Sequence, residues 1–227
     1  MKYVLYVYSL GLVLNLYSYF KEIKGSKFYS PFFIFKIFVW ILSFNIFFEV
    51  LKRVYDVKFF NVNFILVIFI VSVILSFIHK KYVCISFSYV ISYFILRFLN
   101  FSVSVKEIMF LIGSLHIFEG IFIIFQKDFL NLSYERGVLK FYLPLVLNKI
   151  PLIFLVFYRR NFKNKNEYYV RIISGVLIFF YGIIILLIGS FKSVYGLILS
   201  PFLHEGILFL ERKFYIFLRK DRRRGKI

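Results

Sequence analysis

Eight long apolar runs follow one another along this chain, separated by short polar connections. A helix that crosses a bilayer needs roughly 17–25 mostly apolar residues, because the hydrocarbon core is about 30 Å thick. The runs have about that length, and they cover residues 3–20, 31–51, 59–78, 82–99, 107–125, 141–158, 170–190 and 194–211. The pattern predicts an all-α fold, a polytopic transmembrane helical bundle of about eight spans, in which the eighth run either crosses fully or is re-entrant.

The composition supports a membrane protein and indicates a bacterial source. Hydrophobic residues make up 61% of the chain, against about 45–50% in an average soluble protein. The lone Cys84 excludes an internal disulfide and a cysteine-rich metal site. Alanine and threonine are both absent while Phe, Ile, Lys and Asn abound, which points to an AT-rich bacterial genome. No small-x-small cleavage site follows the first run, so we expect it to be a retained span.

The formal charge of +19 comes mostly from lysines and arginines between the apolar runs. Basic residues accumulate in cytoplasmic loops of membrane proteins. With Lys36 and Lys149 left out because they lie inside apolar runs, eight crossings divide the basic residues 19 against 9 between the two sides, and seven divide them 17 against 11. The rule therefore favours eight crossings, and it predicts a multi-pass protein of the bacterial plasma membrane with both termini cytoplasmic.

The last residues form a separate unit in this interpretation. We expect a transmembrane helical domain over residues 1–211 and a basic cytoplasmic tail over residues 212–227. Basic residues beside a membrane contribute about 1 kcal/mol each toward anionic lipid headgroups. A cytoplasmic protein partner is the alternative ligand, and nucleic acid is not expected because no folded binding module accompanies the charge. The tail residues in question are Arg219, Lys220, Arg222, Arg223 and Arg224.

Glycines mark the expected contacts between helices. Gly175, Gly182 and Gly189 recur every seven residues, which keeps them on one seam of a helix. In lipid, small residues at a helix interface allow two backbones to approach closely. Gly113 and Gly120 have the same spacing in the fifth run and are expected to admit a neighbouring helix.

Two pairs of ionisable residues lie well inside apolar runs, His116 with Glu119 and His204 with Glu205. Such groups are costly in lipid and face the bundle interior by default. The favoured interpretation is a buried polar clamp in which these four residues join two helices, with no cofactor. A zinc or iron site made of the same four residues is one alternative, although no HExxH motif is present. A proton or ion relay is the other.

The segments that carry these residues resemble a known family. "LHIFEG", Leu115–Gly120, precedes a proline-led run and a basic loop, and "SPFLHEGILFLERK" follows from Ser200. This order resembles the multi-span membrane domain of the PDZ-containing membrane proteins of Gram-positive bacteria, the family of the MinJ-type topological determinants of cell division. The likeness covers about residues 105–213, and it falls on His116, Glu119, Gly120, Ser200, Pro201, His204 and Glu205. The printed chain has no PDZ domain, and Leu143-Pro144 stands where the family has Trp-Pro.

The sequence thus predicts a non-enzymatic membrane scaffold that recruits partners, in cell division or envelope processes as the resemblance implies. A separate PDZ protein is one such partner. The competing hypothesis is an intramembrane metal-dependent enzyme or a proton- or ion-coupled carrier that uses the buried histidines and glutamates.

Overall fold

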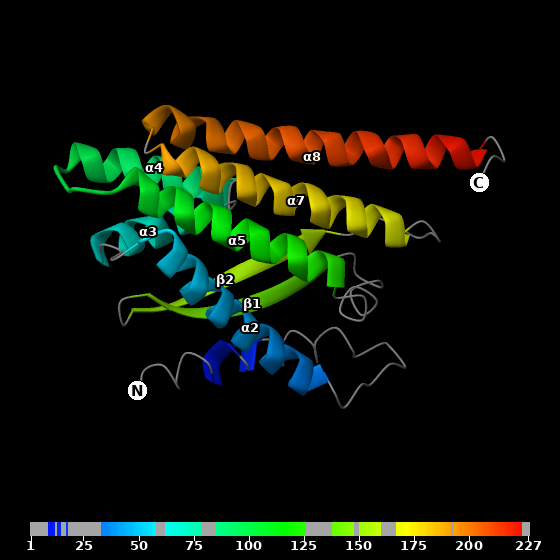
Figure 1. Cartoon of the computed structure of the whole chain (residues 1–227), viewed down its shortest axis with the longest axis horizontal. Coiled ribbons are helices and arrows are strands. Elements are labelled where there is room, and N and C mark those ends of the chain that lie inside the picture. The colour runs from blue at the N-terminus through cyan, green and yellow to red at the C-terminus, as the bar shows by residue number, and fades with distance from the viewer. Residues whose placement is uncertain are drawn as a thin grey trace.

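The structure, a computed structural model, describes residues 9–11, 13–14, 17, 33–57, 62–78, 85–125, 138–147, 150–159, 167–191 and 193–223. Helices dominate this part of the chain, and α5, α7 and α8 lie side by side as its longest layer (Figure 1). The elements are α2 (Phe33–Val54), α3 (Val62–Ile78), α4 (Ile85–Phe98), α5 (Val105–Phe125), β1 (Val138–Leu147), β2 (Ile150–Arg159), α7 (Glu167–Ser190) and α8 (Val194–Arg223).

Three of the described helices contain segments long and apolar enough to cross a membrane, namely Val105–Phe125, Arg171–Ser190 and Val194–Glu211. Ser86–Phe98 is a shorter apolar helix. α2 and α3 occupy the second and third expected runs. Most of the first expected span, residues 3–20, lies outside the described residues. The helical membrane class is therefore supported by three candidate spans, and the expected total of eight stays a prediction.

One expected helix is replaced by a β-hairpin. Where the sequence predicts a helical span over residues 141–158, β1 and β2 pair antiparallel, with Pro144 opposite Ile153 and Val146 opposite Pro151. A proline inside a helix removes a backbone hydrogen bond and costs about 3 kcal/mol. Each strand of a two-stranded ribbon has an edge without ladder bonds, where proline is tolerated. The two prolines thus disfavour a helix here, and the hairpin accommodates both.

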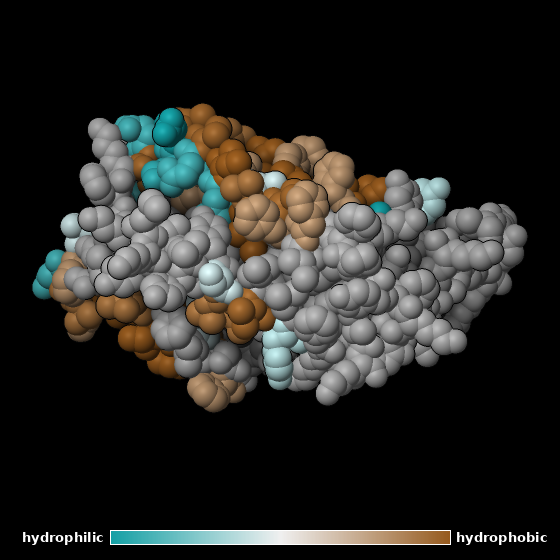
Figure 2. All heavy atoms as spheres, turned by 90° about the horizontal axis from the view of Figure 1, so that it is seen from below, coloured by the Kyte–Doolittle hydropathy of each residue, from teal (hydrophilic) through white to brown (hydrophobic). Residues whose placement is uncertain are grey.

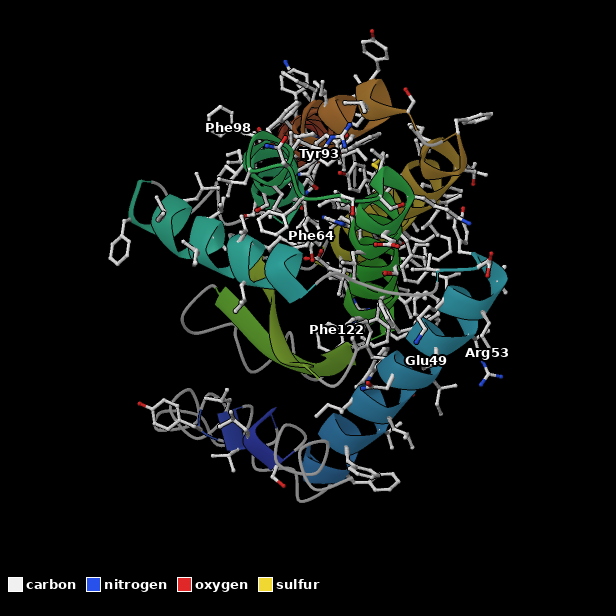
Figure 3. The ribbon with its side chains drawn as sticks, turned by 90° about the vertical axis from the view of Figure 1, so that its left-hand side faces the viewer. Glu49, Arg53, Phe64, Tyr93, Phe98 and Phe122 are labelled. Carbon is white, nitrogen blue, oxygen red and sulfur yellow. The ribbon has the colours of Figure 1, made fainter. Side chains whose placement is uncertain are left out.

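α5 is the centre of the bundle, and most of its residues are buried. Aromatic rings of α2 pack against it: the centroid of Trp40 lies 5.5 Å from that of Phe118 and 5.1 Å from that of Phe122, and Phe44 lies 4.6 Å from Phe118. Phe122 is fully buried in the interior, whereas Phe98 at the end of α4 points away from the bundle (Figure 3). These edge-to-face and tilted contacts fix α2 against α5.

The described outer surface is also largely apolar. Along α3, the exposed residues Leu66, Ile70 and Ile74 recur every four positions, so they form one stripe on the helix. Brown hydrophobic areas reach the surface on the face seen in Figure 2. A protein that buries aromatic residues and also exposes apolar stripes is suited to a lipid solvent rather than to water.

α2 and α4 end in the same way, on a non-glycine residue with positive φ. Asp56 has φ 48° and Asn100 has φ 60°. The amide of Val57 donates to the carbonyl of Lys52, and the amide of Asp56 to that of Arg53; Phe101 and Asn100 repeat the pattern on α4. This is a Schellman cap, in which Asn or Asp tolerates the left-handed conformation that glycine usually adopts.

Candidate functional site

The glycines form a tight antiparallel contact between α5 and α7. A Cβ atom built on Gly120 would lie 2.6 Å from the carbonyl oxygen of Gly175, and one on Gly113 would lie 2.9 Å from that of Gly182. A Cβ on Gly189 would lie 2.6 Å from the Cβ of Met109. Residue numbers fall on α5 as they rise on α7, so the two helices run in opposite directions. All five glycines singled out in the sequence lie in this contact, where only glycine fits without displacing a neighbour.

Pro201, in the segment "SPFLHE", leaves one backbone carbonyl inside α8 without its helical hydrogen-bond donor. Pro201 has no amide hydrogen, so the carbonyl of Leu197 loses the helical partner it would otherwise have. The hydroxyl of Ser200 donates to this carbonyl at 2.8 Å. Ser200 is fully buried. The adjacent serine therefore satisfies the acceptor that the proline leaves open.

Tyr181 of α7 connects Ser200 to α4, so that a chain of hydrogen bonds joins three helices. Its hydroxyl donates to the carbonyl of Ser200 at 3.0 Å, and its oxygen lies 2.9 Å from the hydroxyl oxygen of Ser86 on α4. A tyrosine has only one hydroxyl hydrogen, so Ser86 must donate to Tyr181. Tyr181 is 1% exposed and Ser86 is fully buried. The chain runs from α4 through α7 to α8 in one direction.

The two histidines of the sequence hypothesis meet beside Tyr181. The ring of His116 on α5 lies 5.3 Å from that of His204 and 4.8 Å from that of Tyr181, and the third side of the triangle is 5.4 Å. His116 is 3% exposed, and its Nδ1 donates to the carbonyl of Ile112 at 2.7 Å. Because a carbonyl can only accept, Nδ1 carries a proton. We call Ser86, His116, Tyr181, Ser200 and His204 the polar centre.

The two glutamates of the hypothesis lie on the same helices as the histidines, α5 and α8. Glu119 interacts electrostatically with Glu211, which is farther along α8 than His204. Glu211 in turn accepts a hydrogen bond of 2.5 Å from Ser174 of α7. Glu205 is half-buried on α8. The structure thus brings the two histidines together in the polar centre, and the part of Glu119 and Glu205 in the clamp stays a prediction.

The alternative metal site is not assembled by this arrangement. Within the described ranges, which include His116, Glu119, His204 and Glu205, no three His, Cys, Asp or Glu residues are placed to hold a metal ion. Two rings in edge-to-face contact pack as aromatic side chains do.

The basic tail continues a helix. α8 runs without a break from Val194 to Arg223, so the backbone of Arg219, Lys220, Arg222 and Arg223 is helical, while Arg224 lies outside the described residues. At about 1.5 Å per residue, the 30 residues extend for about 45 Å. The C-terminal part of α8 extends past the N-terminal end of α7 in Figure 1.

The sequence hypothesis missed Ser86, Tyr181, Ser174 and Glu211. A signal existed for Tyr181, which lies next to Gly182 and therefore close to the glycine seam. Serines and tyrosines are too frequent in this chain to be singled out by type alone.

Comparison with known proteins identifies no relative of this chain. No protein-family model, no curated protein and no solved structure matches the chain. The resemblance carried by "LHIFEG" and "SPFLHEG" therefore stays a prediction.

Proposed function

We propose that this protein is a non-enzymatic scaffold of a bacterial plasma membrane, in which α4, α5, α7 and α8 form a fixed core that positions partner proteins. Cell division or envelope assembly is the process that the sequence resemblance favours, and a separate PDZ protein is one candidate partner. The protein crosses the membrane several times, and the basic end of α8 lies in the cytoplasm, where anionic headgroups are available to it.

One observation carries this proposal: the buried hydroxyl groups of Ser86, Tyr181 and Ser200 form hydrogen bonds inside the core. The three bonds link Ser86 to Tyr181, Tyr181 to the carbonyl of Ser200, and the hydroxyl of Ser200 to the carbonyl of Leu197. Hydrogen bonds between membrane helices contribute roughly 0.6–2 kcal/mol each and specify which helices meet. A catalytic or transport site needs polar groups that a substrate or water can reach, whereas Tyr181 and His116 are almost completely enclosed.

The glycine contact supports the same interpretation. The backbones of α5 and α7 already meet closely at Gly113/Gly182 and at Gly120/Gly175. This leaves no room for α5 to slide along α7. A carrier must alternate between conformations by moving helices against each other. The α5–α7 pair is better suited to a static support.

The test uses a substitution that keeps an aromatic ring at residue 204 but removes its acid–base and metal-binding groups. His204→Phe retains a ring beside His116 and Tyr181 but removes both ring nitrogens, so an enzyme or proton carrier that uses this histidine would lose its activity. We expect His204→Phe to restore the growth and division of a strain that lacks the protein. His204→Ala, which removes the ring contacts as well, is expected to restore them less well because it opens a cavity.

Elemental analysis of the purified protein is the second part of this test. Stoichiometric zinc or iron that is lost in both His116→Ala and His204→Ala would overturn the scaffold proposal. Failure of His204→Phe to complement, with the variant folded and present at the normal level, would overturn it as well.

A further inference from the structure

We propose that Pro144 and Pro151 keep the hairpin of β1 and β2 two-stranded, because each proline interrupts one open edge of the sheet and so prevents a second copy of this chain from adding a strand there. This inference does not depend on the scaffold proposal, because it rests on the register of two strands and on the chemistry of proline.

The register decides which way the backbone of each proline faces. In an antiparallel pair, successive residues direct their N–H and C=O groups alternately toward the partner strand and away from it. The pair nearest the turn is Leu147 opposite Ile150, with two residues between them along the chain. In such a short connection the carbonyl of the first residue accepts from the amide of the last, so this is a hydrogen-bonded pair.

Counting away from this pair places both prolines in the other class. Pro151 opposite Val146 is one step from the closing pair, and Pro144 opposite Ile153 is three steps from it. Both numbers are odd, so both pairs are of the kind whose backbone groups point away from the partner. Proline has no amide hydrogen, so the hairpin loses no ladder bond at these positions, and each outer edge lacks one donor instead.

Each edge thus contains one of the two prolines. The residues that direct their backbone groups outward are Val138, Lys140, Tyr142, Pro144 and Val146 on β1, and Pro151, Ile153, Leu155, Phe157 and Arg159 on β2. Pro144 lies inside its row, whereas Pro151 lies at the end of its row near the turn. We therefore expect Pro144 to block its edge more strongly than Pro151 does.

A strand from a second copy is the occupant that these edges would otherwise admit. The sheet of described strands consists of β1 and β2, so each leaves one edge open. α2 contacts β1, but a helix bonds its backbone groups internally and cannot complete a sheet. Both strands are strongly apolar, with one charged residue each, which favours pairing between edges. A second copy brings the same strands with the same open edges into the same membrane, where an unsatisfied backbone group is especially costly.

Two copies of β1 show how the block acts. If they paired antiparallel about Tyr142, Pro144 of each copy would lie opposite Lys140 of the other. At both places the bond that residue 144 should donate cannot form, and the proline ring occupies the space of the missing hydrogen. With valine at residue 144, every outward residue of β1 could donate to the added strand.

The test restores the two donors in the full-length protein. Pro144→Val with Pro151→Val supplies an amide hydrogen to each edge. In a Cys84→Ser background that carries Tyr142→Cys, we expect these two changes to raise the yield of disulfide-linked dimers severalfold under mild oxidation in membranes. Leu145→Val with Leu152→Val is the matched control. It introduces the same side chain at two hydrogen-bonded positions and adds no outward donor, so the dimer yield should stay unchanged.

A second measurement shows whether the hairpin is retained. Tyr142→Cys with Leu155→Cys places two cysteines directly opposite each other within one chain. The Cα atoms of such a non-hydrogen-bonded pair lie about 4.5 Å apart, which is within the range of a disulfide. We expect this disulfide to form both in the protein with its two prolines and in the variant with two valines.

Four results would overturn the inference. An unchanged dimer yield in the valine variant, with the disulfide inside the hairpin still formed, would mean that the edges need no block. An equal rise in the control would assign the effect to β-branched side chains. Loss of the disulfide inside the hairpin in the valine variant would mean that the prolines act only against a helix. Absence of this disulfide in the protein with its prolines would contradict the register itself.

Discussion

Gly120→Ala tests the packing of α5 on α7 at the position where the least space is available. The added methyl carbon would lie 2.6 Å from two backbone atoms of α7, the carbonyl oxygen of Gly175 and the amide nitrogen of Phe179. Carbon atoms pack at about 3.5–4.0 Å, so the helices must separate by roughly 1 Å. No rotamer change can relieve this contact, because both obstructing atoms belong to the backbone.

The expected loss follows from two opposing terms. Overpacking of a close contact costs typically about 1–3 kcal/mol, and a backbone clash belongs at the upper end. Replacing glycine by alanine within a helix returns about 1 kcal/mol. The net destabilisation is therefore about 2 kcal/mol, which corresponds to roughly a 30-fold fall in the folded-to-unfolded ratio.

Gly206→Ala is the matched control, because a Cβ atom there has no neighbour within 4 Å. Reversible unfolding of the full-length protein in bicelles measures both variants. We expect Gly206→Ala to equal or exceed the wild type in stability and Gly120→Ala to fall below it. Adding Gly175→Ala to Gly120→Ala should cost less than the sum of the single changes, since one separation relieves both contacts. Equal stabilities of Gly120→Ala and Gly206→Ala would refute this reasoning.

Three further predictions concern the polar centre and a helix cap. Tyr181→Phe removes a donor to Ser200 and an acceptor from Ser86, so it should lower the free energy of unfolding in bicelles by about 1–2 kcal/mol; an unchanged value would contradict the hydrogen-bond chain. Ser200→Ala should cost about 1 kcal/mol, but nearly nothing in a Pro201→Ala background, where residue 201 regains an amide hydrogen; equal costs in both backgrounds, measured as a double-mutant cycle, would show that the serine does not act on the proline. Asn100→Gly should raise the free energy of unfolding by about 0.5 kcal/mol, and the melting temperature with it, because glycine adopts positive φ without strain; a lowered melting temperature would contradict the cap.

The helical segments could be anticipated because apolar length alone decides whether a helix can cross a bilayer. α5, α7 and the first part of α8 fall close to their expected runs for this reason. The run over residues 141–158 has the same hydropathy, but Pro144 and Pro151 oppose a helix, and hydropathy does not record backbone hydrogen bonds. The helix that continues through residues 212–223 was also missed, because charge marks a membrane boundary without ending a helix.

The candidate site, too, could be predicted only in part from the sequence. His116 and His204 stood out because ionisable groups are rare in lipid, and the structure places their rings together. Glu119 is assigned to the same cluster because it is three residues from His116; the structure shows its electrostatic interaction with Glu211, and its part in the cluster stays a prediction. Spacing along one helix indicates which face a residue occupies, but only the packing of the helices decides which residue of another helix it meets.

Disulfide crosslinking between α5 and α7 tests the central claim, that these helices pack antiparallel on their glycines. In a Cys84→Ser background, Met109→Cys combined with Gly189→Cys brings two Cβ atoms into contact, since a Cβ at residue 189 lies 2.6 Å from that of Met109. We predict that this pair forms a disulfide under mild oxidation in membranes and that Met109→Cys with Ile172→Cys does not. A disulfide with residue 172 and none with residue 189 would mean that the helices are parallel, and it would contradict the account.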